Sequence, residues 1–343
     1  MGALRLASQS VSPSQRLPAL DWMRGLVMVL MASDHAAAAF DGGRRITDSS
    51  LIPGWDQPLD ATWLLRWASH LCAPGFLFLA GTSLALSLER KRMSGVGAGR
   101  IDRDLLVRGL LIGAVDLLFI NWFWEPGYLL LQVMYAIGLS MILMIGLRRL
   151  PSPLLIVLAL AGLGVGEWTR TGSFLTAMEP GPAAAALLVN AGVLPQRVFS
   201  MQAVLCVYPL VPWCAMMVLG WVLGRFLVRR RQSDPEHRVT VRVLTLWGAA
   251  GLAVFAVLRG LNGFGNLAQV RQDGSLLQWL HVSKYPPSLT FSALELGLLA
   301  LGLAGLFVLA RTREGRVSHS SPLLVFGPVS YTHLTLPTTC TPC

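Results

Sequence analysis

The fold class is decided by the stretch LDWMRGLVMVLMASDH, residues 20–35. It opens an apolar run that ends near residue 40, and about 20 predominantly apolar residues suffice for one helical crossing of a bilayer. Seven more runs of this kind follow. The eight predicted spans are residues 20–40, 63–88, 104–123, 127–147, 153–168, 201–227, 241–259 and 286–310. We therefore predict an all-α polytopic transmembrane helical bundle, with a truncated ninth span that begins near residue 322.

The composition excludes an ordinary soluble domain. Hydrophobic residues make up 54% of the 343 residues and charged residues only 13%, whereas about 25% of the residues in a typical soluble domain are charged. The lipid bilayer is therefore the first partner that the sequence predicts.

The net charge of +10 would point to a nucleic-acid partner in a soluble chain. With the N-terminus inside, however, nineteen of the 28 Lys and Arg residues lie on the N-terminal side of the predicted spans, eight lie on the other side, and Arg24 lies within the first span. Short cytoplasmic loops retain Lys and Arg. The charge therefore predicts orientation, with residues 1–19 as a cytoplasmic segment, and we expect no nucleic-acid partner.

The C-terminal tail differs from the rest of the chain. Residues 328–343 are too polar to span a membrane, and they resemble the in-frame translation of a sequencing-library adapter. We expect the native domain to cover residues 20–327 and to be truncated at its C-terminus. The cysteines outside this tail are Cys72, Cys206 and Cys214, whose spacing predicts neither a disulfide framework nor a metal site.

The first span carries ionisable residues, which are costly within a bilayer and mark functional or paired positions. At 100° per residue, Asp21, Arg24 and His35 lie on one helix face, with Arg24 and His35 about 16 Å apart along the axis. Asp34 precedes His35. Two uses are open at this point: a chemical site on this face, or an Asp21–Arg24 pair that only fixes the depth of the helix.

The second span brings another histidine to a comparable depth. His70 lies near its outer end, and Pro74-Gly75 is expected to bend the helix there. Facing histidines with Asp34 beside them would form a centre for proton transfer. A structural pairing between helices is the alternative, and we interpret Glu295 in the last span as a helix-bridging residue.

Several segments resemble one known family. They are residues 20–31, 34–35, 70–83, 136–143, 208–213 and 284–289. In this order they are similar to the bacterial membrane family related to the catalytic domain of heparan-alpha-glucosaminide N-acetyltransferase. The opening Leu-Asp-x-x-Arg-Gly resembles a broader set of transmembrane acyltransferases, in which an Arg is also followed by ten residues and a His.

The resemblance implies acyl transfer at a bacterial inner membrane. Acetyl-CoA or another acyl-CoA would enter from the cytosol, and the acceptor on the far side would be a sugar or a glycan. Arg24, with Asp21, would hold CoA. His35, His70 and Asp34 would form the catalytic group, with His35 as a base or acyl relay.

The chain also departs from the family. Eukaryotic members carry their active histidine in the loop between the first two spans, whereas residues 41–62 contain no histidine. The lysosomal substrate and the acyl-histidine step are therefore not carried over. Two other functions stay open: a proton-coupled transporter or exporter, and a non-catalytic subunit of an envelope-glycan assembly complex.

Overall fold

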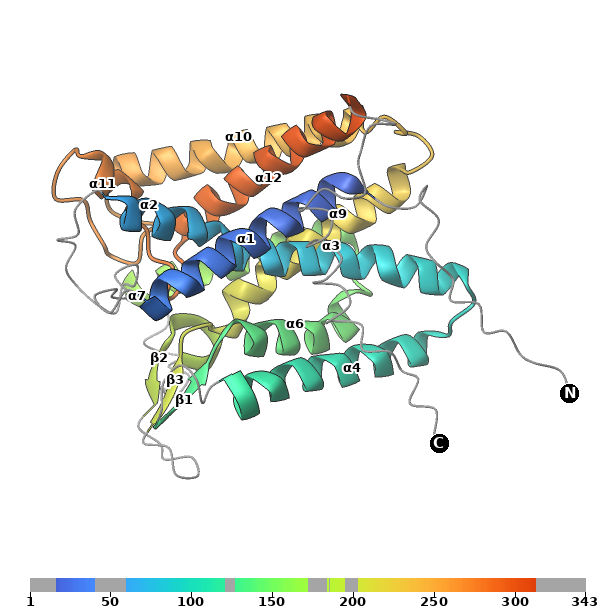
Figure 1. The fold of residues 1–343 in the computed structure, drawn as a ribbon, viewed down its shortest axis with the longest axis horizontal. Coiled ribbons are helices and arrows are strands. Elements are labelled where there is room, and N and C mark those ends of the chain that lie inside the picture. Colours follow the sequence, from blue (N-terminus) through green and yellow to red (C-terminus); the bar gives the residue numbers. More distant parts are fainter. Residues whose placement is uncertain are drawn as a thin grey trace, which may run out of the picture.

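The computed structural model describes residues 17–40, 60–120, 127–171, 184, 186–194 and 203–312, which form a mostly helical bundle (Figure 1). The long helices are α1 (Pro18–Phe40), α3 (Cys72–Met93), α4 (Ala98–Val115), α6 (Val133–Leu147), α7 (Ser152–Thr171), α9 (Leu210–Arg230), α10 (Arg238–Leu261) and α12 (Leu289–Thr312). Short helices are α2 (Ala61–Ala68) and α11 (Leu276–Leu280), and π-helical turns cover Asp116–Ile120 and Ala186–Asn190. The predicted ninth span and the tail 328–343 lie outside the described residues, as does most of the segment 1–19.

Five of the described helical segments are long and apolar enough to cross a membrane. They are Ala61–Met93, Ser152–Thr169, Leu210–Arg230, Arg238–Leu261 and Leu289–Thr312. They confirm the helices predicted over 63–88, 153–168, 241–259 and 286–310, and most of 201–227. The helix predicted over 127–147 is shorter, because α6 has only 15 residues. The total of eight spans and the side of the N-terminus stay predictions.

The prediction of an all-α fold is wrong in one respect, since the chain also forms a three-stranded sheet in the order β1-β3-β2. β1 (Tyr128–Leu131) pairs in parallel with β3 (Ala203–Cys206), and β2 (Gly192–Leu194) pairs antiparallel to β3. Short apolar runs do not distinguish a strand from a buried helix. The first residues of two predicted spans are therefore strands, and α9 begins only after Pro209.

The second predicted span is interrupted at a different place from the one expected. A 3-10 turn, Ser69–Leu71, separates α2 from α3. Pro74 lies in the first turn of α3, where its missing N–H would have no helical partner in any case. The irregular backbone therefore falls at His70 itself and not at Pro74-Gly75.

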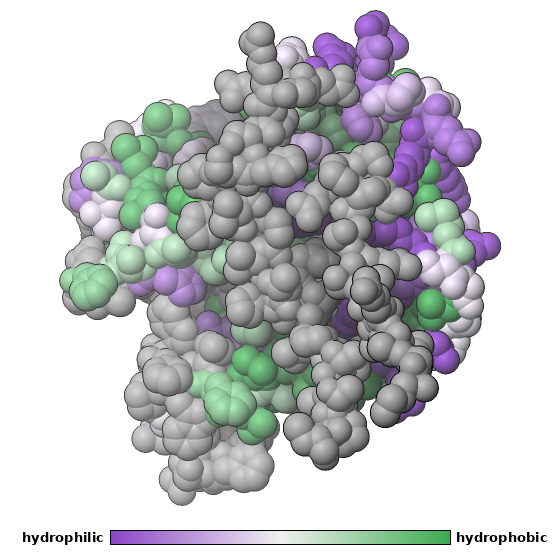
Figure 2. Space-filling model, turned by 45° about the vertical axis from the view of Figure 1, so that its right-hand side comes forward, coloured by the Kyte–Doolittle hydropathy of each residue, from purple (hydrophilic) through white to green (hydrophobic). Residues whose placement is uncertain are grey.

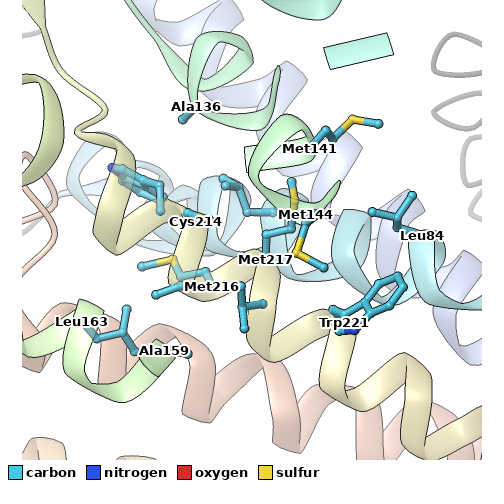
Figure 3. Packing of buried hydrophobic residues seen from close by; sticks show 14 of the residues in the cluster. Leu84, Ala136, Met141, Met144, Ala159, Leu163, Cys214, Met216, Met217 and Trp221 are labelled. Atoms are coloured by element: carbon cyan, nitrogen blue, oxygen red, sulfur yellow. The ribbon is translucent and has the colours of Figure 1, made fainter. Parts of the chain in front are cut away.

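Close packing joins α3 to α9. A Cβ added to Gly81 would lie 1.9 Å from the carbonyl oxygen of Met217, and one added to Gly220 would lie 1.8 Å from that of Phe78. The hydroxyl of Thr82 donates to the carbonyl oxygen of Gly220 over 3.0 Å. Only glycine permits this approach of two helix backbones. Figure 3 shows Met216, Met217 and Trp221 of α9 among buried side chains of α3, α6 and α7.

The bundle has two distinct ends. At the basic end, α3 and α9 finish with arginine and lysine side chains, Arg90, Lys91, Arg92, Arg229 and Arg230. At the sheet end, which lies to the left in Figure 1, α9 begins shortly after β3. Figure 2, in which the right-hand side of Figure 1 comes forward, shows hydrophilic residues gathered along the right of the view.

The outward faces of several helices are apolar. Large hydrophobic side chains are exposed on α4, α7 and α10, among them Leu110, Val157, Leu158, Leu246 and Val257. Large exposed apolar surfaces mark contact with a membrane or a partner. With the five apolar helices, they support a membrane location.

Candidate functional site

Arg24 and Asp21 form an ion pair in the first part of α1. The Arg24 Nη1 atom donates to Asp21 Oδ1 over 2.6 Å, and the two side chains are 13% and 15% exposed. A second guanidinium nitrogen, Nη2, donates to the hydroxyl of Ser83 on α3. Asp21 also lies in the first helical turn, where a negative charge is favourable. The predicted pair is therefore present, and it also ties α1 to α3.

Asp34 joins α1 to the second helical segment at the sheet end. Arg66 Nη1 on α2 lies 3.1 Å and 3.3 Å from its two carboxylate oxygens. The Ser69 hydroxyl donates to Asp34 Oδ1 over 2.7 Å. Asp34 thus holds the turn that carries His70.

The two histidines have different surroundings. His35 is exposed, and its Nδ1 lies 2.8 Å from the carbonyl oxygen of Met31 on the same helix. His70 is only 2% exposed, and its ring makes an edge contact with Phe291 of α12, with centroids 5.8 Å apart. The structure therefore does not place both histidines in one buried centre, and the buried position belongs to His70.

Two further ionisable residues lie near His70 that the sequence analysis did not assign to the site. Lys284 is 3% exposed and Glu295 is 2% exposed. Both interact electrostatically with the thiol of Cys72, as do Asp34 and Arg66. Glu295 follows Phe291 by one turn of α12, so that it lies on the face that His70 contacts. Charged residues from four segments thus converge at the sheet end of the bundle.

Aromatic side chains surround this region. The hydroxyls of Tyr208 and Tyr285 are 3.3 Å apart. The ring of Tyr208 lies against those of Trp213 and Tyr285, with centroids at 4.6 Å and 5.4 Å, and Trp213 in turn contacts Phe291 at 6.3 Å. The Lys284 ammonium lies 5.2 Å from the ring centroid of Tyr285, in cation–π range. The charged groups are therefore held in a largely apolar, water-poor setting.

A buried polar network fixes the segment that carries Lys284. Asn266 Oδ1 accepts hydrogen bonds from the backbone N–H of Ser283 and from the hydroxyls of Ser288 and Thr290, at 3.1, 3.0 and 2.9 Å. Glu167, at the end of α7, accepts from the backbone N–H groups of Leu267 and Leu289. Both Asn266 and Glu167 are buried. Side chains held by buried networks of this kind are preorganised.

At the basic end, ion pairs join α4 to the residues that follow α6. Arg148 and Arg149 both bond to the carboxylate of Asp102. The hydrogen bond from Arg148, and the positive charges of both arginines, hold the pKa of Asp102 below its usual value. Arg225 of α9 donates to the backbone carbonyls of Arg148 and Leu150. These contacts fix the helix ends beside the basic surface.

The sequence signals for the added residues were weak. Lys284 belongs to Lys-Tyr-Pro-Pro-Ser-Leu, residues 284–289, a segment that resembles the family but that carries no separate functional signal. Glu295 was interpreted as a helix-bridging residue, but its Oε1 atom accepts no hydrogen bond from any described residue. A lysine directly before an apolar span, followed by a carboxylate inside that span, is the pattern that could have found this pair.

Comparison with known proteins agrees with the resemblance. Residues 16–259 match the family model described as heparan-alpha-glucosaminide N-acetyltransferase, catalytic. No curated protein matches the chain at a significant level. The matched region includes α1, α3 and α9, with Arg24, Asp34 and His70, whereas Lys284 and Glu295 lie beyond it. Since this match covers well over half of the residues, the chain belongs to the heparan-alpha-glucosaminide N-acetyltransferase catalytic-domain family.

Proposed function

We propose that the protein is a membrane-bound acyltransferase that moves an acetyl or other acyl group from acyl-CoA to a sugar or envelope-glycan acceptor. The family supports acetyl transfer as the reaction class. One observation carries the proposal: α1 holds Arg24 at one end and, ten residues later, Asp34 beside the His70 turn. Ten residues of helix span about 15 Å. Donor and acceptor would therefore meet along this helix.

Arg24 binds the acyl-CoA donor. Its guanidinium has five N–H donors in a planar fork that suits phosphate and carbonyl oxygens. Asp21 and Ser83 each receive one bond from it and so fix its direction. With the N-terminus in the cytoplasm, this end of α1 faces the compartment that contains acyl-CoA.

His70 is the general base of the acyl-transfer step. The acceptor hydroxyl or amine attacks the thioester carbonyl, so that a C–O or C–N bond forms while the C–S bond breaks. The proton of the acceptor passes to the imidazole of His70, and the departing CoA thiolate takes up a proton to become a thiol. Asp34 positions the His70 turn through Ser69. His35, exposed one residue further along α1, would pass the proton outward.

Acetyl-CoA binding tests the donor half of the proposal. The full chain in lipid nanodiscs is titrated with acetyl-CoA by calorimetry. Arg24→Ala is expected to weaken binding at least about tenfold, because a charge-assisted hydrogen bond contributes roughly 1.5–3 kcal/mol. Arg103→Ala is the matched control, since Arg103 is an exposed arginine of α4. Equal affinity of wild type and Arg24→Ala would contradict the proposal.

The location that we infer is the bacterial inner membrane with a cytoplasmic N-terminus. It is supported by the excess of Lys and Arg on one side of the predicted spans. Reporter fusions after residue 96 and after residue 234 test it, because both loops are expected inside. An alkaline phosphatase that is active at either position would contradict this orientation.

A proton-coupled transporter is the second candidate. It is favoured by the buried ionisable residues Lys284 and Glu295, because such groups within a helical bundle mark proton and solute pathways. Proton flux into proteoliposomes that contain no acyl-CoA would select this function.

A further inference from the structure

We propose that Lys284 and Glu295 form the acceptor subsite, and that they bind between them a hydroxyl group of a neutral sugar ring. This inference rests on the acyl transfer proposed above and adds two residues beyond the family match. It assigns the sheet end of the bundle, where α3, α9 and α12 begin, to recognition of the acceptor.

The first argument is the lack of direct partners. In the part of the chain that the structure describes, Lys284 and Glu295 form no hydrogen bond and no ion pair, either with each other or with a third residue. Both residues are at least 97% buried, and the Oε1 atom of Glu295 is fully buried without a hydrogen bond. Buried polar groups of native proteins are satisfied in the large majority of cases. An ammonium and a carboxyl group left in this way therefore indicate a ligand.

The second argument is convergence. Lys284 and Glu295 come from different segments, yet each interacts electrostatically with the other and with the Cys72 thiol. The thiol in turn points toward the carbonyl oxygen of Val27, 3.6 Å away, on α1. The His70 ring lies on Phe291, one turn before Glu295. Glu295 therefore lies on the face of α12 that the His70 ring contacts, and Lys284 interacts with Glu295 there.

The third argument is the chemistry of the pair. A hydroxyl group donates to a carboxyl oxygen and accepts from an ammonium at the same time, so one sugar hydroxyl satisfies both residues. An apolar group would satisfy neither residue. The rings of Tyr208, Trp213 and Tyr285 supply the apolar wall that ligand sites combine with a few polar groups.

The fourth argument is rigidity. Residues 282–288 are buried, and Asn266 and Glu167 hold the backbone on both sides of them. The hydroxyl of Ser283 also donates to the carbonyl oxygen of Pro286 over 2.9 Å. The position of the Lys284 ammonium is therefore set before a ligand arrives, which lowers the entropic cost of binding.

The experiment measures sugar binding and acetyl-CoA binding separately on the full chain in nanodiscs. The probes are radiolabelled methyl glucoside and acetyl-CoA. The variants are Lys284→Met, Glu295→Gln and the double variant, and the controls are Lys91→Met and Glu236→Gln, which remove a lysine and a glutamate at the other end of the bundle. Each site variant is expected to lower sugar affinity at least about tenfold. Acetyl-CoA affinity stays within about twofold, because Ser83, to which Arg24 donates, follows Cys72 by eleven residues of α3, about 16 Å along the helix axis.

The double variant separates binding from folding. Buried polar groups without hydrogen-bond partners destabilise a fold, so the double variant, which removes both charges and keeps side chains of similar size, is expected to melt close to wild type while its sugar binding stays lost. Wild-type sugar affinity in the double variant, or no saturable sugar binding by wild type, would overturn the inference. Sugar binding that depends on the pair, in a protein that binds no acetyl-CoA, would support the subsite and overturn the acyl transfer.

Discussion

Arg24 and Lys284 are both cations inside the bundle, but their surroundings differ. Arg24 has a carboxylate and a hydroxyl as partners. Lys284 is more deeply buried, and within the described residues it has only the ring of Tyr285 and electrostatic interactions with Glu295 and the Cys72 thiol. Burial alone therefore does not identify a binding group. The number of partners that the protein already supplies separates a cation that orders two helices from one that is left for a ligand.

The largest effect is expected from the two histidines. His70→Ala should lower acyl transfer about 100-fold or more, because loss of a general base removes a factor of roughly 10² to 10⁴. His35→Ala should lower it less than about tenfold, since His35 is exposed and bonds to its own helix. Single-turnover assays with radiolabelled acetyl-CoA measure both. Equal losses, or a larger loss for His35→Ala, would show that the exposed histidine is the base.

A change that pushes α3 away from α9 is expected to disturb both the basic end and the sheet end of the bundle. The reason is that α3 carries Ser83 toward the basic end and Cys72 at the sheet end. Gly81→Ala adds a methyl group against the Met217 carbonyl and should destabilise the fold by about 3 kcal/mol. Gly164→Ala is the matched control, because no atom lies within 4 Å of its added Cβ. Thermal unfolding in nanodiscs measures the difference. An equal melting temperature for both variants would contradict the close packing.

Loss of the hydrogen bonds that hold the segment around Lys284 should lower sugar binding at the sheet end and leave acetyl-CoA binding unchanged. Asn266→Ala leaves the buried hydroxyls of Ser288 and Thr290 without their acceptor, at a cost of about 2 kcal/mol. Sugar binding should fall with it, while acetyl-CoA binding should not. Ser288→Ala, which removes fewer bonds, should cost about 1 kcal/mol. If Asn266→Ala lowered acetyl-CoA affinity as strongly as sugar affinity, the two ends would not be independent.

The smallest effect concerns the basic end. Since the pKa of Asp102 is lowered in the folded protein, its stabilising contribution is present above the unfolded pKa of about 3.9 and is lost as the pH falls through the lower folded value. Asp102→Asn should therefore lower the melting temperature slightly at pH 7 and have no effect at pH values below the folded pKa. The effect is small because the carboxylate is partly exposed. A difference that grows on acidification would contradict this sign.

The sequence predicted the long helices well and the connections poorly. Hydropathy over 18 or more residues depends on many side chains, so the helices over 153–168 and 241–259 were located to within a few residues. The strands over Tyr128–Leu131 and Ala203–Cys206 are stable only because they pair with each other across more than 70 residues. No local pattern contains that pairing, and both strands were therefore assigned to helices.

The site was predictable where its residues are neighbours in sequence. Helical spacing alone placed Asp21 beside Arg24, and the structure shows the ion pair. The ion pair between Asp34 and Arg66 was not predicted. In the sequence, Arg66 counts only among the positive charges that predict the orientation of the spans in the membrane. The His70 ring contacts Phe291, one turn before Glu295, through the packing of α12 against the turn that precedes α3, a long-range contact that spacing does not encode. Lys284 interacts electrostatically with Glu295 in the same region.

Glu167 has a consequence for any large motion of the molecule. One of its carboxylate oxygens accepts from the backbone N–H of Leu267, in the loop that follows α10, and the other accepts from that of Leu289, at the start of α12. Carriers change access by rocking one group of helices against another. In this protein the dividing plane of such a movement could not pass between α7 and α12 without breaking the buried hydrogen bond from Leu289 to Glu167. We therefore expect α7 and α12 to move together. A disulfide engineered between these two helices is expected to leave a carrier cycle intact.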